Sequence, residues 1–277
     1  MTVSEADFAK WQEWVGREQS MTERVEPVIL FRYAAALGEP AAPDDTSLPS
    51  LAHWAFFLDA VQPGEIGPDG HPRRGGFLPP VSLPRRMFAA SDIAFHTPLE
   101  SDRPASQVAR IAGLERKQGS SGDLVLLTLE LDVEQGGRKC VSEKRTIIYR
   151  DDGSPTPLPT EEPIQAAQGD VVWQPGPVDL FRFSAVTFNS HRIHYDRPYA
   201  TEVEGYPALV VQGPLTAARL FGVARKRYGP LSRFSFRAMA PLFVDQAVTL
   251  REDGKGAIIA IRCDGVEAMR ARFEAAS

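Results

Sequence analysis

The sequence is short of the residues that mark several specialised classes of protein. It has two cysteines, Cys140 and Cys263, and neither belongs to a CxxC pair. We therefore expect two reduced thiols, and neither a disulfide framework nor a zinc site built on cysteine. No segment approaches the ~20 apolar residues of a membrane-spanning helix, and the first seven residues, Met1 to Asp7, are acidic and lack an apolar core. A cytoplasmic protein with no membrane partner is expected.

Concentrated positive charge is missing as well. The formal net charge is −5, and the lysines and arginines are scattered rather than gathered in runs. Nucleic acid is therefore not an expected partner. Apolar residues make up 43% of the chain and charged residues 24%, which is typical of a globular protein. A length of 277 residues suffices for one large core or for two smaller units.

Prolines interrupt the chain at positions 155, 157, 159 and 163. Because proline stops both helices and sheets, residues 151–170 are predicted to be a linker between an N-terminal unit, 1–150, and a C-terminal unit, 171–277. In the N-terminal unit an apolar helix over 50–61, with Ser50 as its N-cap, is predicted to precede a meander of strands. These strands are predicted over 107–117, 124–134 and 139–150.

The C-terminal unit repeats this order of helix and meander. Alternating apolar residues predict a strand over 180–188, and a helix is predicted over 215–228, directly after Gly213 and Pro214. Four more strands are predicted over 232–240, 247–252, 257–263 and 267–273. A helix wrapped by a curved antiparallel sheet makes the expected fold class α+β.

Chemically active side chains gather in one segment, residues 188–200, which reads FNSHRIHYDRPYA. It holds Asn189, His191, His194 and Asp196, although the whole chain has only five histidines. Two of these histidines three residues apart, beside an aspartate, are more than composition alone predicts. We expect the active site here.

Two interpretations of the cluster place no catalysis in it. His191, His194 and Asp196 imitate the two-histidine, one-carboxylate set of non-haem iron sites. No histidine follows His194 to act as a distant ligand, and three ligands from one short turn would converge poorly, so no metal is expected. Alternatively the cluster is structural, with Asp196 starting a helical turn at Arg197 and Pro198. That interpretation is favoured for Asp196 but does not explain Asn189 with His194.

The third interpretation is general acid–base catalysis. A histidine exchanges protons near neutral pH, and an amide five residues earlier can hold a water against it. The start of the helix at Gly213 presents unpaired N–H groups that would polarise a carbonyl oxygen. His194, Asn189 and Gly213 together are therefore predicted to form a proton-transfer site.

At this point the sequence shows a resemblance to a known family. Residues 188–200 resemble the hydratase motif of MaoC-like enzymes, and more closely the branch of hydroxyacyl-thioester dehydratase type 2, mesaconyl-C4-CoA hydratase and itaconyl-CoA hydratase. Three segments of the first half are similar to the non-catalytic half of that branch, so that the resemblance runs from about residue 20 to the end. The first segment consists of 84–90 followed by 95–99, and the others are 117–122 and 147–150.

The resemblance implies a double hot-dog fold in which only the C-terminal unit is catalytic. It also implies reversible hydration of an enoyl-CoA, or dehydration of a 3-hydroxyacyl thioester, without a cofactor. His194 falls on the family's catalytic histidine and Gly213 on its oxyanion-hole glycine. Asn189 stands where simpler hydratases carry an acidic residue, and Gln212 where they carry a histidine. Since an amide cannot take a proton, we expect Asn189 to orient the water.

Substrate contacts are also expected from the resemblance. His191 and Gln212 are predicted to lie at the substrate, although His191 also fits a support for the turn. Arg85 and Arg86 are either surface charges or cations that hold CoA phosphates or a substrate carboxylate. The expected partner is an acyl-CoA or acyl carrier protein thioester, with a short or C4 to C5 dicarboxylyl group, and the expected assembly is a homodimer.

Two other functions stay open from the sequence. A thioesterase can share this fold, but the helix predicted over 215–228 has no Asp or Glu to activate water. A non-enzymatic acyl-thioester binding module would follow if Asn189 marks a loss of catalysis.

Overall fold

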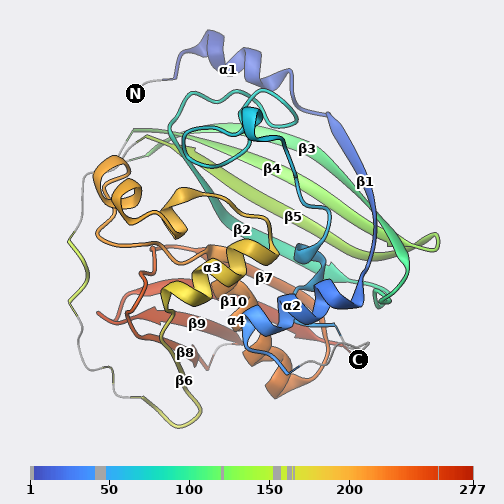
Figure 1. Cartoon of the computed structure of the whole chain (residues 1–277), viewed down its shortest axis with the longest axis vertical. Helices are drawn as coiled ribbons and strands as arrows, with labels where there is room; N and C mark the ends of the chain where they lie inside the picture. Colours follow the sequence, from blue (N-terminus) through green and yellow to red (C-terminus); the bar gives the residue numbers. More distant parts are fainter. Residues whose placement is uncertain are drawn as a thin grey trace.

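The computed structural model of the chain describes residues 3–40, 48–119, 122–151, 157–160, 164, 166–254 and 256–276. Ten strands in these ranges form one curved antiparallel sheet (Figure 1). In chain order they are β1 (Glu18–Arg24), β2 (Arg85–Phe95), β3 (Pro104–Gly119), β4 (Gly122–Gln135), β5 (Arg138–Arg150), β6 (Val171–Trp173), β7 (Leu231–Ala238), β8 (Val248–Glu252), β9 (Ala257–Arg262) and β10 (Glu267–Ala275).

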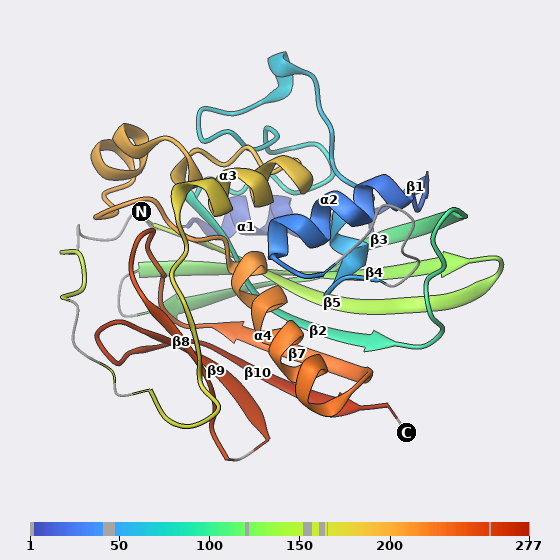
Figure 2. The same cartoon turned by 60° about the horizontal axis from the view of Figure 1, so that its bottom comes forward.

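Four α-helices and four short helical turns complete the described chain. The α-helices are α1 (Glu5–Gln12), α2 (Pro27–Leu37), α3 (Pro177–Val186) and α4 (Gly213–Tyr228). The turns are η1 (Ala52–Ala55), η2 (Pro63–Glu65), η3 (Arg192–His194) and η4 (Tyr199–Val203). Helices α2, α3 and α4 lie on the same face of the sheet (Figure 2). The α+β class predicted from the sequence is confirmed.

The two halves of the sheet have the same internal order. Across the sheet the strands run β1-β3-β4-β5-β2-β7-β10-β9-β8-β6, so each half begins with its first strand at the edge and ends with its second strand at the middle. The halves join where β2 pairs with β7, from Ala90 opposite Arg237 to Ala94 opposite Arg233. The repeated order predicted for the two halves therefore holds for the strands.

The predicted meander strands are confirmed to within two residues at most ends. Strands 107–117, 124–134 and 139–150 fall within β3, β4 and β5, and the four strands predicted after residue 230 correspond to β7 through β10. In β4 buried and less buried residues alternate along the strand, which is the period-2 pattern on which the prediction rested. The helix predicted over 215–228 lies within α4.

The strand predicted over 180–188 is wrong, because this segment forms helix α3. Pro177 stands in the first turn, where its missing N–H costs nothing, and the Asp179 carboxylate accepts the N–H of Gly176 at 2.9 Å. The side chains that face the core are Leu180, Phe183 and Ser184. Their spacing of three and four residues belongs to a helix rather than to a strand.

The helix predicted over 50–61 is also wrong in extent. Only Ala52–Ala55 form a helical turn, η1. Leu51 and Phe57 flank it with φ of 54° and 58°, a left-handed backbone that an α-helix cannot continue through. Residues 50–57 are nevertheless buried as expected, and Glu143 of β5 holds them by accepting the Trp54 Nε1–H at 3.0 Å. In the second half of the sheet the long helix was predicted correctly as α4, whereas the helix predicted for the first half is reduced to the turn η1.

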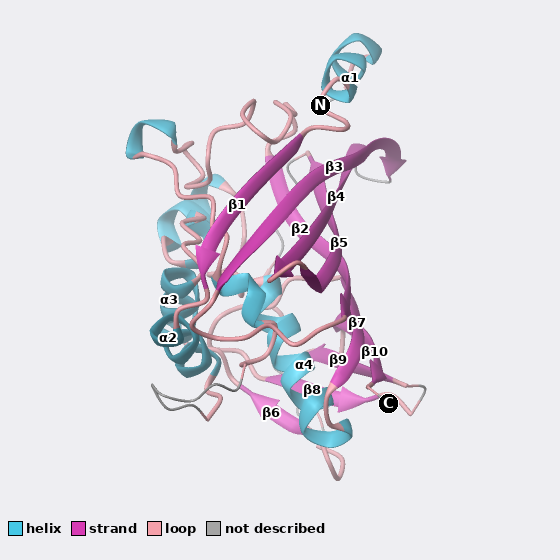
Figure 3. Ribbon diagram, turned by 90° about the vertical axis from the view of Figure 1, so that its right-hand side faces the viewer, coloured by secondary structure: helices cyan, strands magenta, loops and turns pink. Residues whose placement is uncertain are grey.

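Helix α2 was not predicted, and it pairs with α3. Pro27 begins it and Gly38, with φ of 66°, ends it, as is common for helices. The two helices run beside one another away from the sheet (Figure 3). Tyr33 of α2 and Phe183 of α3 meet with their ring centroids 6.0 Å apart.

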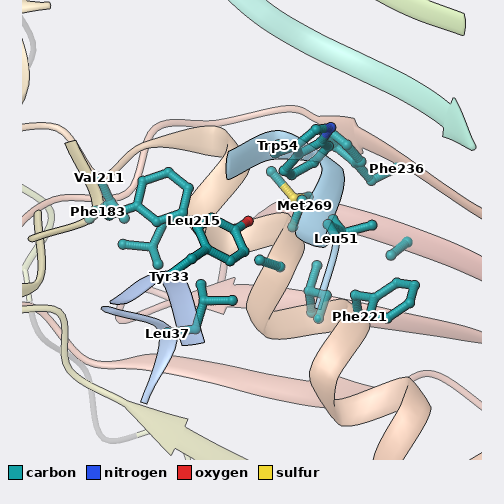
Figure 4. Packing of buried hydrophobic residues seen from close by; sticks show 14 of the residues in the cluster. Tyr33, Leu37, Leu51, Trp54, Phe183, Val211, Leu215, Phe221, Phe236 and Met269 are labelled. Carbon is teal, nitrogen blue, oxygen red and sulfur yellow. The ribbon is translucent and has the colours of Figure 1, made fainter. Parts of the chain in front are cut away.

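Helix α4 lies at the centre of the main hydrophobic core and crosses the strands of the second half (Figure 2). Leu215 and Leu220 are fully buried, and Phe221 packs edge-on against Phe234 of β7 with 5.1 Å between ring centroids. Figure 4 shows Trp54 of η1 beside Phe236 of β7, so the turn that replaces a helix in the first half joins the same core. This packing fixes the N-terminus of α4, and with it Gly213.

Much of the linker predicted over 151–170 lies outside the described residues, as do Ser120 and Ser121, which follow β3 in the sequence. Residues 157–160 form neither helix nor strand. The division into units 1–150 and 171–277 stays a prediction. Within the described ranges, none of the helices combines the length and the apolar character that crossing a bilayer requires.

Candidate active site

A cavity of about 550 Å³ lies between the two halves and is lined by residues from both. Asn189, His191, His194 and Gly213 of the second half all border it, and Arg86 borders it from β2. The structure therefore brings together the three residues predicted to carry the chemistry. It also brings a cation from the half that was expected to be non-catalytic.

His194 ends turn η3, and its imidazole is buried. Its Nδ1 lies 2.7 Å from the carbonyl oxygen of Val210. Because a carbonyl oxygen can only accept, the neutral ring carries its proton on Nδ1 and leaves Nε2 as a proton acceptor. Burial, together with the nearby His191, lowers the pKa of His194 to about 3. The ring is therefore a neutral base at physiological pH.

Asn189 is oriented by its own turn. Its backbone N–H donates to the carbonyl of Ser184 in α3 at 2.8 Å, and the N–H of His191 lies 3.2 Å from Oδ1. Oδ1 is the acceptor of the amide, whereas Nδ2 can only donate and takes no part in this contact. Asn189 lines the cavity and has a donor in Nδ2, which an ionised acidic residue at this position would lack.

His191 stands between two other histidines. Its ring centroid lies 5.4 Å from that of His194 and 4.1 Å from that of His71. Its Nε2 is 3.2 Å from Oε1 of Glu204 in the segment after η4. His191 lines the cavity, but these contacts also make it the support of the turn that carries His194.

Gly213 is the first residue of α4, with Gln212 as the N-cap residue. A backbone N–H in the first turn of a helix has no preceding carbonyl to donate to, and the helix dipole adds partial positive charge there. Since Gly213 lines the cavity, this N–H is suited to a developing oxyanion. A Cβ here would lie 3.5 Å from the carbonyl oxygen of Phe88, an ordinary contact.

Asp196 takes the structural role that was favoured for it. Its carboxylate binds Arg192 at 2.7 Å and accepts the N–H of Tyr199 at 3.2 Å, which starts the turn η4. The Arg192 hydrogen bond, followed by that from Tyr199, holds the pKa of Asp196 below its usual range. Asp196 is thus engaged by Arg192 and Tyr199. Within the described ranges no three His, Cys, Asp or Glu side chains are grouped as metal ligands.

Comparison with known proteins agrees with this geometry. Residues 51–244 match the family model described as hydroxyacyl-thioester dehydratase type 2. The chain is also 44% identical, over 246 residues, to the mesaconyl-C(4)-CoA hydratase of Chloroflexus aurantiacus, an alignment that covers 85% of this chain and 86% of that one. The chain belongs to the hydroxyacyl-thioester dehydratase type 2 family. Membership makes it a hydratase or dehydratase of acyl thioesters, which confirms the reaction class expected from the sequence.

Solved structures show the fold of the family. HtdX of Mycobacterium tuberculosis matches with a TM-score of 0.67 at 18% identity, over 93% of this chain and 99% of that one. A second Mycobacterium tuberculosis protein, described as having a double hotdog fold, matches with a TM-score of 0.53 at 11% identity, over 94% and 95% of the two chains. The double hot-dog fold expected from the resemblance is confirmed.

Two of the residues predicted to contact substrate take other partners and do not line the cavity. Gln212 is fully buried, and its amide donates to the carbonyl of Leu180 at 2.8 Å and to Oγ of Ser184 at 2.9 Å, so it ties α4 to α3. Arg85 is also buried and donates to the carbonyl of Glu204. Through these contacts both residues support the walls of the site.

Sequence reasoning missed the loop that carries Asp69, Gly70 and His71. Oγ of Ser190 donates to the Gly70 carbonyl, and the N–H of Arg192 donates to the Asp69 carbonyl at 2.9 Å. His71 therefore reaches the cavity beside the motif although 120 residues separate the two in sequence. The available signal was the scarcity of histidine, because three of the chain's five histidines meet here.

Proposed function

We propose that the protein catalyses the reversible hydration of an enoyl-CoA, with His194 as the acid–base residue, Asn189 as the ligand of the water and the Gly213 N–H as the oxyanion donor. The observation that carries the proposal is the hydrogen bond from His194 Nδ1 to the Val210 carbonyl. It leaves an unprotonated Nε2 on a buried ring that borders the same cavity as the start of α4.

In the dehydration direction Nε2 of His194 removes the proton α to the thioester carbonyl. The electron pair moves into the carbonyl, and the Gly213 N–H donates to the resulting enolate oxygen. One such donor contributes roughly 3 kcal/mol to the transition state. As the enolate expels the β-hydroxyl, the proton on His194 passes to that oxygen, and Asn189 Nδ2–H holds the water formed. Hydration reverses each step, with syn addition to one face.

We propose a short C4 to C5 dicarboxylyl-CoA, such as mesaconyl-C4-CoA or itaconyl-CoA, as the substrate. Arg86 supports this assignment because it lines the cavity from β2. Its positive charge also contributes, after burial, to the lowered pKa of His71, so the guanidinium acts close to the site. A cation in a half-buried cavity favours an acyl group that ends in a carboxylate. The name of the Chloroflexus aurantiacus relative agrees with such a substrate.

The experiment follows the conjugated enoyl absorbance and the free thiol together. With mesaconyl-C4-CoA the absorbance is expected to fall while no CoA is released. Release of CoA without a hydroxyacyl product would instead identify a thioesterase, and binding without turnover a binding module. Arg86→Met is expected to lower kcat/KM for mesaconyl-C4-CoA about tenfold or more relative to crotonyl-CoA. Only the mesaconyl group has a free carboxylate, and the substitution removes the cation that would bind it. Equal losses on both would contradict the dicarboxylyl assignment.

We further propose that the protein acts in the cytoplasm as a homodimer. Apolar side chains on the outer side of α3 support self-association, since Val178 is 68% and Phe181 64% exposed in the single chain. Analytical ultracentrifugation tests this directly. A single species at the mass of one 30.4 kDa chain, at micromolar concentration, would contradict it.

A further inference from the structure

His71 is a second imidazole in the site, and it comes from the half of the fold expected to be non-catalytic. It lines the cavity with Asn189 and His194, and its ring lies 4.1 Å from that of His191, measured between centroids. Gly70 and Ser190 fasten its loop to the catalytic turn. His71 is thus held as part of the site rather than on a separate surface.

Asp69 fixes the state of His71. Its Oδ2 lies 3.2 Å from Nδ1 of His71, and its Oδ1 accepts the backbone N–H of His71 at 3.0 Å. Although burial raises it, the pKa of Asp69 is held below its usual range by the hydrogen bonds that the carboxylate accepts from His71. An ionised carboxylate can only accept, so the His71 proton resides on Nδ1 and Nε2 is an acceptor.

His71 is also neutral when the site is at rest. Burial, and then the positive charge of Arg86, lower its pKa to about 3 despite the neighbouring carboxylate. His194 is neutral for a similar reason. Two neutral imidazoles therefore stand on either side of His191, and each has its Nδ1 proton engaged by a fixed oxygen.

We propose that His71 is a catalytic residue whose Nε2 accepts the hydrogen of the attacking water that is not transferred to carbon. This rests on the function proposed above. The water oxygen then accepts from Asn189 Nδ2–H, and its two hydrogens point to His194 and to His71. One lone pair is left for the β-carbon, so the four tetrahedral directions of the water are all assigned.

The atoms of the step balance with a single travelling proton. One O–H bond of the water breaks and its proton goes to His194 Nε2, while the oxygen forms a bond to the β-carbon and the double-bond electrons move into the thioester as an enolate. His194 then gives that proton to the α-carbon. The other O–H bond is kept and becomes the product hydroxyl, still donated to His71. Both imidazoles end neutral, as they began.

The test separates the hydroxyl side of the reaction from the α-carbon side. His71→Leu removes the acceptor at similar volume, and His71→Gln restores an acceptor oxygen. Each variant is measured for hydration of mesaconyl-C4-CoA and for loss of α-deuterium from the saturated thioesters butyryl-CoA and glutaryl-CoA in H₂O, with thermal unfolding as the check that both variants fold.

We expect His71→Leu to lower kcat for hydration roughly 10²-fold with KM little changed, because the water loses its orientation. The α-deuterium exchange, which needs His194 and Gly213 but no water at the β-carbon, is expected to stay within about twofold of wild type. His71→Gln is expected to recover about tenfold in kcat over His71→Leu. Wild-type hydration by His71→Leu, or an equal loss of hydration and exchange, would overturn the assignment and leave His71 as a support for His191. Absence of exchange in wild type, or its persistence in His194→Ala, would instead count against the proposed function.

Discussion

The α-carbon of Gly70 lies against the carbonyl of Ser190, so closely that a Cβ on Gly70 would stand 1.9 Å from that oxygen. Gly70 also has φ of 89°, a conformation that other residues rarely adopt. The contact joins the loop of the N-terminal half to the turn that carries Asn189 and His194. The close approach at Gly70, together with the hydrogen bonds that Ser190 and Arg192 donate to the same loop, therefore fixes the relative positions of the two halves of the site.

Gly70→Ala is expected to separate these two segments and lower kcat for hydration about 10²-fold, since a displacement near 1 Å at a catalytic group has that effect. Gly76→Ala is the matched control in the same loop, because nothing lies within 4 Å of its Cβ position. Steady-state kinetics with melting temperatures distinguish displacement from unfolding. Equal activity of the two variants would show that the contact between Gly70 and Ser190 does not position the site.

Asn189→Asp is expected to change the pH dependence of the reaction. A carboxylate in place of Nδ2–H would favour the imidazolium form of His194, so the acid limb of kcat/KM should move to higher pH. Asn189→Ala removes the donor without adding charge, and should lower kcat by roughly 10²-fold while leaving the limb in place. A pH profile that is the same for Asn189→Asp and wild type would contradict the short distance assumed between residue 189 and His194.

Stability is expected to fall with acid because of His194. The pKa of an unfolded histidine is about 6.5, whereas burial lowers that of His194 to about 3 in the folded protein. The folded state binds this proton less readily, so the contribution is complete above pH 6.5 and is lost as the pH falls toward 3, at up to about 1.4 kcal/mol per pH unit. In urea unfolding, the destabilisation caused by His194→Ala should therefore be about 2 kcal/mol smaller at pH 5 than at pH 8. The same destabilisation at both pH values would show that His194 titrates normally.

Gln212→Leu is expected to affect stability rather than substrate binding. It removes the donor to the Leu180 carbonyl and to Ser184 Oγ in a fully buried place, which should cost about 1–3 kcal/mol. Ser184→Ala, which loses only one of these bonds, is expected to cost less. A rise in KM at unchanged stability would instead support the contact between Gln212 and the substrate that was predicted from the sequence.

The sequence predicted much of the fold because the strands of the meanders alternate clearly, as in β4 and β10. It failed where the local signal was ambiguous. The apolar residues around Leu180 and Phe183 are compatible with a short strand as well as with a helix. The helix is indicated only by Pro177 and Asp179, which form its first turn. The helix predicted over 50–61 was wrong because the left-handed conformations of Leu51 and Phe57 are imposed by packing, which no periodicity reveals. His194, Asn189 and Gly213 lie within 25 residues, so motif spacing sufficed for them. His71 reaches them only through the contact of two distant segments.

In the proposed reaction Nε2 of His194 moves the proton between water and the α-carbon. The most direct measurement is kcat for hydration of mesaconyl-C4-CoA by His194→Gln, with His96→Gln as the control, because His96 is a surface residue whose ring bonds only Ser142 Oγ. We expect a loss of about 10³-fold for His194→Gln and wild-type activity for the control. Retention of more than a tenth of the activity by His194→Gln, at unchanged melting temperature, would contradict it.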